Sequence, residues 1–334
     1  MARKAKSKTA KIQPAVRTLT FTIPALTADE TKYIDLSQCA SLVNRRFYRQ
    51  GINWAVAGFT LHATSGTTGE VQIMKVPTTW VAGNAWEKAM RAWLKQQNDA
   101  IEEAGAESAV ARFRDFKIHA DEGHVAATFG SNLLPAVYDA GTGTWQAFTA
   151  GEWDPSQIVI PNATSTDVAP HESFLHMTGT NFYPVGSNAA TAQSRGIIEG
   201  YADSRAYPQS PDPVGPAIGS ANNWLRDMFD DGNDSNAITI NATDRNDNLP
   251  YDQVNYPNGE LNANELQYHD QIALTTSTIS AKSTGRGGAF PCGLIKLRLS
   301  QGLSSVEGIP QAWLQVHLVP GTHRGYLYEP MTDM

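Results

Sequence analysis

The stretch Arg17-Thr-Leu-Thr-Phe-Thr-Ile-Pro24 decides the fold class. Its apolar residues, Leu19, Phe21 and Ile23, alternate with threonines. Because successive residues of a strand point to opposite faces, this alternation predicts a strand with one buried face. Order in the chain is therefore expected to begin at residue 17, and with a β-strand.

The same reading predicts strands along the rest of the chain. The apolar run from Ile52 to His62 loses its alternation at Gly58, which indicates either a β-bulge or a strand buried on both faces. Val71 to Val76 follows turn-forming residues 65–69, so these two runs are predicted to pair as a hairpin. Further strands are predicted at Ile158–Ile160, Phe174–Met177, Gly196–Tyr201, Ala237–Asn241, Gln271–Ser280, Leu294–Leu299 and Trp313–Val319.

More than eight strands with turn residues between them predict an all-β chain, either a sandwich or a barrel. Two helices are expected to interrupt the strands. The long one spans residues 84–104, where a capping box at Asn84 precedes an apolar stripe that includes Met90 and Trp93. The short one lies near Ser220–Phe229. Residues 202–270 are rich in Asp, Asn, Pro and Gly, which is typical of a functional loop region.

Charge is distributed unevenly along the chain. The net charge is −7, but the first 17 residues hold six of the 26 basic residues and no acidic one. The other 20 basic residues are outnumbered by 33 acidic ones, so the remainder carries −13. Residues 1–16 are therefore predicted to be a disordered basic arm ahead of one folded domain, residues 17–334.

Such an arm favours a polyanionic partner, because flexible cations gain affinity for nucleic acid by releasing counterions. No arrangement of base-reading side chains is evident, so binding is expected to be independent of sequence. The block Asn44-Arg-Arg-Phe-Tyr-Arg49 interleaves arginines with aromatics, which suits phosphate contact with base stacking, or a surface segment with two buried aromatics. The candidate nucleic-acid-binding residues are Arg3, Lys4, Lys6, Lys8, Lys11, Arg17, Arg45, Arg46 and Arg49.

Catalytic and metal motifs do not emerge from the residue pattern. His171 and His176 stand five residues apart, where a helical zinc-protease motif requires four. Cys39 and Cys292 form no disulfide framework or metal-ligand spacing. We therefore expect a non-enzyme without cofactors. The acidic segments 230–234 and 244–248 could offer oxygen ligands to Ca²⁺ or form ordinary Asx turns. No signal peptide or membrane span is expected, which predicts a soluble protein that stays in the cell.

Several segments resemble capsid proteins of circular, Rep-encoding single-stranded DNA viruses. They are Tyr33-Ile-Asp-Leu-Ser, Asn44-Arg-Arg-Phe-Tyr-Arg-Gln50, Pro77-Thr-Thr-Trp80, Asn84-Ala-Trp-Glu-Lys88 and Glu107-Ser-Ala-Val-Ala-Arg-Phe-Arg-Asp-Phe116. The resemblance extends from about residue 17 to the C-terminus. It implies a jelly-roll β-sandwich that assembles with copies of itself into an icosahedral shell around single-stranded DNA. It also implies a place in the virion, assembly in the host nucleus and a receptor on the host surface. The arm departs from that family by being short and rich in lysine.

Two other functions compete with the capsid hypothesis. A glycan-binding β-sandwich could use Trp80, Trp145, Trp153 and the Asn/Asp loops as its binding surface. A hydrolase is the third hypothesis, because catalytic triads are assembled in space and need no local motif.

Overall fold

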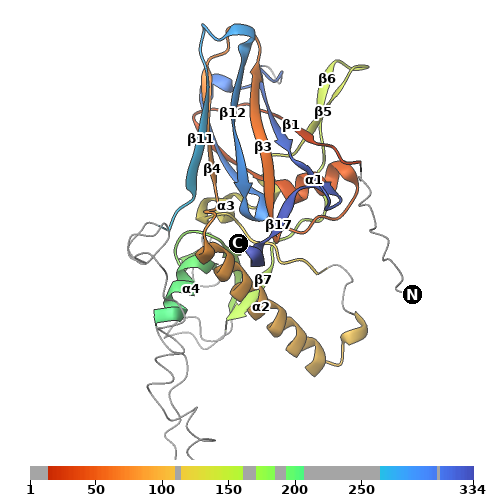
Figure 1. Cartoon of the computed structure of the whole chain (residues 1–334), viewed down its shortest axis with the longest axis vertical. Helices are drawn as coiled ribbons and strands as arrows, with labels where there is room; N and C mark the ends of the chain where they lie inside the picture. The colour runs from red at the N-terminus through yellow and green to blue at the C-terminus, as the bar shows by residue number, and fades with distance from the viewer. Residues whose placement is uncertain (1–13, 110–113, 161–170, 185–192, 207–263, 307–308) are drawn as a thin grey trace, which may run out of the picture.

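A computed structural model describes residues 14–109, 114–160, 171–184, 193–206, 264–306 and 309–334. The fold is mostly β. One antiparallel sheet has the order β1 (Thr18–Thr22), β14 (Ala312–Leu318), β3 (Ile52–Ala63) and β12 (Lys282–Phe290), with β17 (Tyr328–Pro330) added to β3. A second antiparallel sheet has the order β11 (Gln267–Leu274), β4 (Gly69–Lys75), β13 (Leu294–Leu299) and β2 (Glu30–Asp35). The two sheets form the upper half of the molecule in Figure 1.

One hydrophobic core joins the two sheets. In β1 the inward residues Leu19 and Phe21 are buried while Thr18 is exposed, which confirms the predicted one-sided strand. Ile73 and Leu297 enter the same core from the second sheet. Trp54, Tyr48 and Tyr326 are its largest members. Aromatic side chains of this size contribute most of the area buried in a core.

The irregularity near Gly58 is a β-bulge, the first of the two predicted alternatives. His317 of β14 lies opposite Gly58, but the next residue, Leu318, lies opposite Val56, so Ala57 is the extra residue of β3. On the other side of β3, the backbones approach so closely that a Cβ on Gly287 would lie 2.3 Å from the carbonyl oxygen of Val56. Only glycine fits at that point of β12.

The predicted hairpin between residues 52–62 and 71–76 is wrong. β3 pairs with β12, β14 and β17, whereas β4 belongs to the opposite sheet and pairs with β11 and β13. The turn residues 64–68 therefore carry the chain from one sheet to the other. A short loop with turn-forming residues can join two paired strands or two strands of different sheets. The local pattern therefore did not reveal the partner strand.

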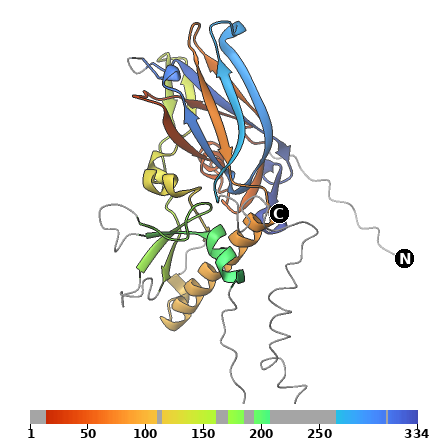
Figure 2. The ribbon, with the colours of Figure 1, turned by 90° about the vertical axis from the view of Figure 1, so that its left-hand side faces the viewer.

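Between β4 and β11 the chain leaves the sandwich and builds an insert below it (Figure 2). A small sheet of the insert has the order β7 (Gln157–Ile160), β8 (His171–His176), β10 (Gln193–Gly196) and β9 (Tyr183–Pro184), with β8 and β10 parallel. The hairpin of β5 (Ala136–Asp139) and β6 (Thr144–Ala147) stands apart from it, beside β1. The helices are α2 (Trp80–Glu103), α3 (Glu122–Ala127) and α4 (Ile197–Ala206).

The predicted helices and strands of this region need corrections. α2 begins at Trp80 instead of residue 84, because Thr79 caps it by accepting a hydrogen bond from the Ala82 amide. Gly196–Tyr201 was predicted as a strand, but helix α4 begins at Ile197. The predicted strand Gln271–Ser280 ends at Leu274. The strand Ala237–Asn241, the helix near Ser220–Phe229 and most of the loop-rich segment 202–270 lie outside the described residues.

A second core holds α2 against the sandwich and the small sheet. It contains Trp86 and Trp93 of α2, Phe116 of the following segment and Met331 near the C-terminus. Trp93 lies with its ring 5.5 Å from that of Phe116. This packing confirms the predicted apolar stripe of the helix, which faces the rest of the domain.

Candidate nucleic-acid interface

The predicted cationic residues fall into two groups. Arg3, Lys4, Lys6, Lys8 and Lys11 lie outside the described residues. Arg17, Arg45, Arg46 and Arg49 are described: Arg46 is half-buried and the other three are exposed. Arg17 lies just before β1, where its carbonyl accepts from the Leu318 amide at 2.7 Å, whereas the other three lie between residues 45 and 49.

Helix α1 (Leu36–Asn44), which the sequence pattern did not predict, positions Arg45. The Asp35 carboxylate caps its N-terminus by accepting from the amides of Ser37 and Gln38, at 2.8 and 3.2 Å. At the other end Arg45 adopts a left-handed conformation with φ of 55°. This conformation stops the helix and turns the chain, so that Arg45 points to the solvent.

The chain enters the domain at the same place. The Val16 amide donates to Asn44 Oδ1 at 3.0 Å, and Tyr326 Oη donates to the Val16 carbonyl at 2.5 Å. Asn44 Nδ2 also donates to Tyr326 Oη at 2.7 Å. Val16 is therefore already anchored to the domain, although it lies within the predicted arm of residues 1–16. Ala15 also packs against the first core, so the described chain enters the domain close to Arg45.

A fifth arginine, Arg324, joins this surface from the far end of the chain. Arg46 Nη1 donates to the Arg324 carbonyl at 3.2 Å, and Tyr48 Oη donates to the same oxygen at 2.9 Å. The Arg324 guanidinium in turn donates to the Phe47 carbonyl. No local sequence signal marked Arg324, because it stands alone between His323 and Gly325.

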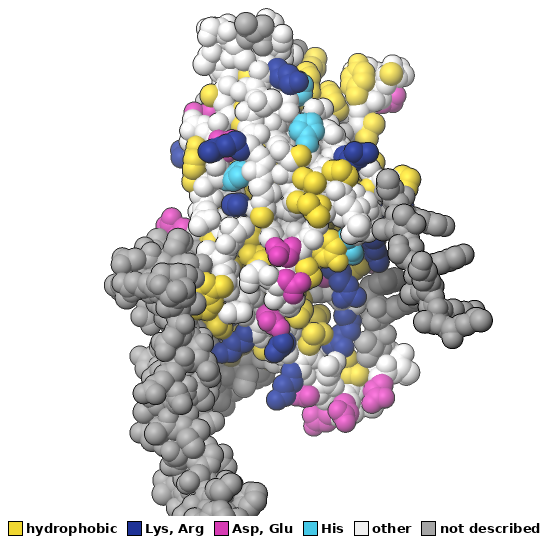
Figure 3. Space-filling model, viewed as in Figure 1, with side chains coloured by type: hydrophobic (Ala, Val, Ile, Leu, Met, Phe, Trp, Pro, Cys, Tyr) yellow, Lys and Arg dark blue, Asp and Glu magenta, His cyan; other side chains and the backbone are white. Residues whose placement is uncertain are grey.

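The positive surface continues down to α2. Arg49 Nη1 donates to the Arg114 carbonyl at 2.7 Å, and Arg114 Nη1 donates to Asn98 Oδ1 of α2 at 2.7 Å. The Arg114 guanidinium also lies 5.8 Å from the Trp93 ring. We call the five residues Arg45, Arg46, Arg49, Arg114 and Arg324 the arginine stripe. Figure 3 shows a column of Lys and Arg side chains on the right-hand side of the molecule, below the region of α1.

The members of the arginine stripe lack the ion pairs that other described arginines form. Within the described part of the chain none of its members forms an ion pair, whereas Arg91, Arg286 and Arg298 pair with Glu87, Asp270 and Asp29. Arg49 acts only at longer range on Asp115, where it opposes the effect of burial, which raises the pKa of that carboxyl to about 7. Clustered, uncompensated cations on an acidic protein produce a positive potential that attracts a polyanion.

The aromatics between these arginines are mainly structural. Tyr48 is 1% exposed, and its ring packs 5.4 Å from that of Tyr326 and 5.8 Å from that of Trp54. Phe47 is half-buried, 6.2 Å from the Trp153 ring. Base stacking on Tyr48 is therefore excluded. The block is a surface segment whose aromatic side chains anchor it while its arginines face outward.

The tryptophans proposed for glycan binding do not share one surface. Trp153 is 8% exposed, and its indole donates to the Asp35 carboxylate at 2.9 Å, which also accepts from Gln50 Nε2. Burial raises the pKa of Asp35 to about 6. Trp80 opens α2 and packs against the second core, while Trp145 lies on β6 with its ring 5.9 Å from that of Trp313. The glycan site as predicted is thus not assembled.

Three buried histidines, His119, His124 and His176, are the nearest approach to a reactive cluster. Burial lowers the pKa of His119 to about 3 and the pKa values of His124 and His176 to about 4. His124 Nδ1 accepts from the Ala120 amide at 3.1 Å, and the opposite nitrogen is 2.8 Å from Asn132 Oδ1. The neutral ring is thereby fixed in the fold. It is poorly suited to act as an acid or base near neutral pH.

Other candidate reactive groups are equally enclosed. Cys39 and Cys292 are fully buried, and burial raises the pKa of both thiols. Among the residues that the structure describes, no three His, Cys, Asp or Glu side chains are grouped in a way that could hold a metal ion. The acidic segments 230–234 and 244–248 lie outside those residues. No helix in the described ranges is long and apolar enough to cross a membrane.

Comparison with known proteins adds no assignment. No family model, no curated protein and no solved structure matches the chain.

Proposed function

We propose that this chain is a viral capsid protein with a jelly-roll fold, which assembles with copies of itself into a closed shell. The observation that carries the proposal is the nesting of the strands. Counted along the chain, the eight principal strands pair first with eighth (β1–β14), second with seventh (β2–β13), third with sixth (β3–β12) and fourth with fifth (β4–β11). This order supports a double-sheet jelly roll, an architecture found in viral capsids and also in lectins and cupins.

The arginine stripe distinguishes the capsid function from the other functions of that architecture. Its cations are without carboxylate partners among the described residues, and the basic segment 1–13 joins the domain beside them. A surface of this kind binds phosphates without reading bases. The proposed partner is nucleic acid bound independently of its sequence. The resemblance described above favours single-stranded DNA.

The remaining parts of the proposal follow from a shell. Its subunits associate mainly with one another, through loops and the insert at the ends of the sandwich. The basic surface faces the interior and the genome, so the protein belongs to the virion and, during assembly, to the host nucleus. The chain itself performs no catalysis in this proposal. The glycan-binding hypothesis is now supported only by the occurrence of the jelly-roll architecture in lectins.

The test is assembly of the recombinant full chain. Sedimentation velocity and negative-stain electron microscopy are expected to detect uniform hollow particles of megadalton mass that contain nucleic acid. Their nucleic acid should be released by high salt and digested by nuclease once the particles are opened. A chain that stays monomeric at high concentration over a wide range of salt and pH would refute the capsid function. A glycan screen of that monomer would then test the lectin hypothesis.

A further inference from the structure

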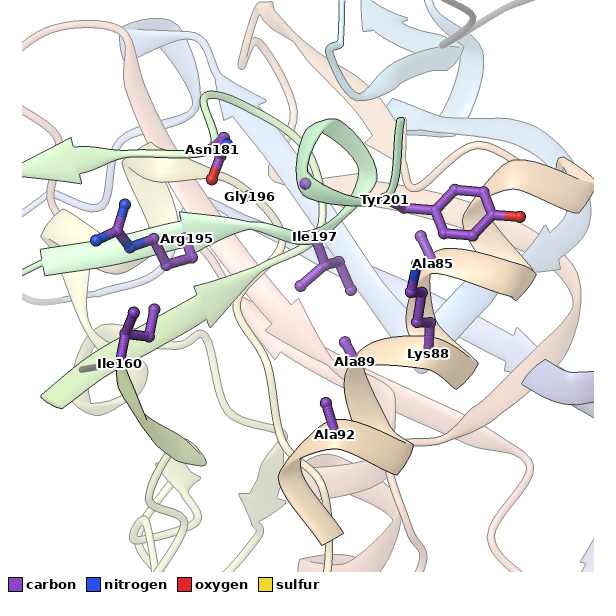
Figure 4. Close-up of a pocket in the computed structure, with 11 residues that line it drawn as sticks. Ala85, Lys88, Ala89, Ala92, Ile160, Asn181, Arg195, Gly196, Ile197 and Tyr201 are labelled. Atoms are coloured by element: carbon purple, nitrogen blue, oxygen red, sulfur yellow. The ribbon is translucent and has the colours of Figure 1, made fainter. Parts of the chain in front are cut away.

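The insert contains a pocket of about 380 Å³ between helices α2 and α4 and strands β7 and β10 (Figure 4). Its floor is aliphatic, with Ala85, Ala89 and Ala92 from α2, Ile160 from β7 and Ile197 from α4. The three alanines follow one another at helical spacing, so they form one face of α2. Their small side chains leave the space that larger residues would fill. Arg114 reaches α2 at Asn98, on the opposite face, so the pocket is separate from the arginine stripe.

The pocket has a cation at each end. Figure 4 shows Arg195, Asn181 and Ile160 at one end and Lys88 and Tyr201 at the other, with Ile197, Ala89 and Ala92 between them. Lys88 Nζ lies 5.6 Å from the centre of the Tyr201 ring, so its charge has an aromatic partner. Among the described residues that line the pocket there is no carboxylate.

Arg195 is the less satisfied of the two cations. Its Nη2 donates to Gln193 Oε1 at 2.9 Å, and its guanidinium lies 4.8 Å from the Phe182 ring. Its Nε is buried and has no acceptor in the described structure. Burial lowers the pKa of Arg195, and no ion pair offsets that effect among the described residues. The buried Nε is out of reach of a ligand, but an anion at this end of the pocket would supply the opposite charge that the guanidinium lacks.

We propose that this pocket binds an alkyl carboxylate, with the carboxylate at Arg195 and the chain along the alanine face of α2. A volume of about 380 Å³ lies in the range of ligand pockets, which are mostly apolar with a few placed polar groups. A nucleotide fits this lining less well. Its base would need several hydrogen-bonding partners, and the aliphatic floor offers none. The proposal is independent of the capsid function.

Isothermal titration calorimetry with the full-length protein tests the proposal, using decanoate, dodecanoate, dodecan-1-ol and dAMP below the micellar range. Dodecanoate should bind with one ligand per chain. It should bind about 15-fold more tightly than decanoate, because it buries two more methylenes and each strengthens binding by about fourfold. Dodecan-1-ol, which lacks the charge, should bind at least about tenfold more weakly than dodecanoate, as expected for loss of a charge-assisted hydrogen bond.

Three variants locate the site. Ala89→Phe fills the pocket and should abolish binding, and Arg195→Gln should weaken dodecanoate by tenfold or more without affecting dodecan-1-ol. Arg91→Gln removes an exposed cation of the same helix that already pairs with Glu87, and it should change nothing. If Ala89→Phe does not fold, Arg195→Gln alone decides. Absence of dodecanoate binding, equal binding of acid and alcohol, unchanged binding by Arg195→Gln, or dAMP binding in place of dodecanoate would each overturn the proposal.

Discussion

Charge removal from the arginine stripe gives the sharpest test of where nucleic acid binds. The triple variant Arg45→Gln, Arg46→Gln and Arg49→Gln removes three cations that have no carboxylate partner among the described residues. The matched control, Arg91→Gln, Arg286→Gln and Arg298→Gln, removes three cations that pair with Glu87, Asp270 and Asp29. Both variants change the net charge by the same amount, so a difference between them reports position and not total charge.

The expected effect can be worked from the number of phosphate contacts. Each contact with single-stranded nucleic acid contributes about 0.7 to the slope of log affinity against log salt. Loss of three contacts should lower that slope by about 2. Between about 50 and 200 mM salt, the affinity of the stripe variant should therefore fall about 20-fold less than that of the native chain. The slope of the control should differ from the native slope by no more than the contribution of one contact, about 0.7.

Folding should survive the substitutions. Arg45 makes no side-chain hydrogen bond that the structure records. Arg46 and Arg49 each lose one bond to a backbone carbonyl, at 3.2 and 2.7 Å. Such exposed bonds contribute about 1 kcal/mol each at most. Thermal melts of both variants should confirm this before binding is measured.

The assay is fluorescence anisotropy of a labelled oligothymidylate with dissociated subunits at four salt concentrations. Slopes that are lowered equally in the two triple variants would refute the assignment of the interface to the stripe, because only net charge would then matter. If the stripe variant keeps the native slope, the contacts lie in residues 1–13 or elsewhere.

Three further predictions concern the insert, the N-terminal segment and pH. In a urea titration, Trp93→Ala should lower the free energy of unfolding by about 3–5 kcal/mol, because Trp93 is 9% exposed and packs on Phe116. Glu87→Ala should lower it by less than about 0.5 kcal/mol, because this variant loses only an exposed ion pair with Arg91. Deletion of residues 1–13 should leave the melting temperature unchanged, because Val16 is retained, but it should remove most co-purifying nucleic acid. In the undeleted chain, trypsin should cut this segment in dissociated subunits and not in particles. Equal cleavage in both forms would place the segment outside the shell. Acid should destabilise the fold. Burial lowers the pKa of His119, His124 and His176 from 6.5 to about 3, 4 and 4. The stability that these neutral side chains contribute is therefore present above pH 6.5 and is lost as the pH falls from 6.5 through the three lowered pKa values. Burial raises the pKa values of Asp35 and Asp115 to about 6 and 7, which has the opposite effect. At these five groups the unfolded chain binds about three protons and the fold about two. Their joint contribution should lower the free energy of unfolding by about 1.4 kcal/mol per pH unit from about pH 6 to pH 4.5. His124→Asn should flatten this slope in denaturant titrations across that range, and an unchanged slope would show that His124 is charged in the fold.

Strands with one buried face could be predicted from the sequence. In β1, β13 and β14 alternate side chains meet the core, so burial itself imposes a period of two on the residues. The bulge in β3 was also predictable, because an extra residue interrupts that period. Helix α4 was not predictable in this way. Its first residues, Ile197 and Ile198, are both buried, and a pair of adjacent buried residues fits a strand or a helix equally well.

Contacts between distant segments could not be predicted. The hairpin predicted for β3 and β4 failed because pairing depends on residues more than 200 positions further along, in β12 and β14. The start of α2 at Trp80 follows from a cap at Thr79, but Asn84 offered an equally good local cap. Arg324 was missed for the same reason: its neighbours in space are Arg46 and Tyr48, not its neighbours in sequence.

The nested strand order explains why the stripe draws on both ends of the chain. Since the first strand pairs with the eighth, Thr18 lies opposite His317, and the segment before β1 must run beside the segment after β14. Tyr326 consequently reaches Val16 and Asn44, and Arg324 is held beside Arg46. The basic N-terminal segment therefore leaves the domain where α1 and the C-terminal turn already present uncompensated cations. Any change that unpairs β1 from β14 should separate these charges as well as weaken the fold, so nucleic-acid binding and stability are coupled at this edge of the sheet.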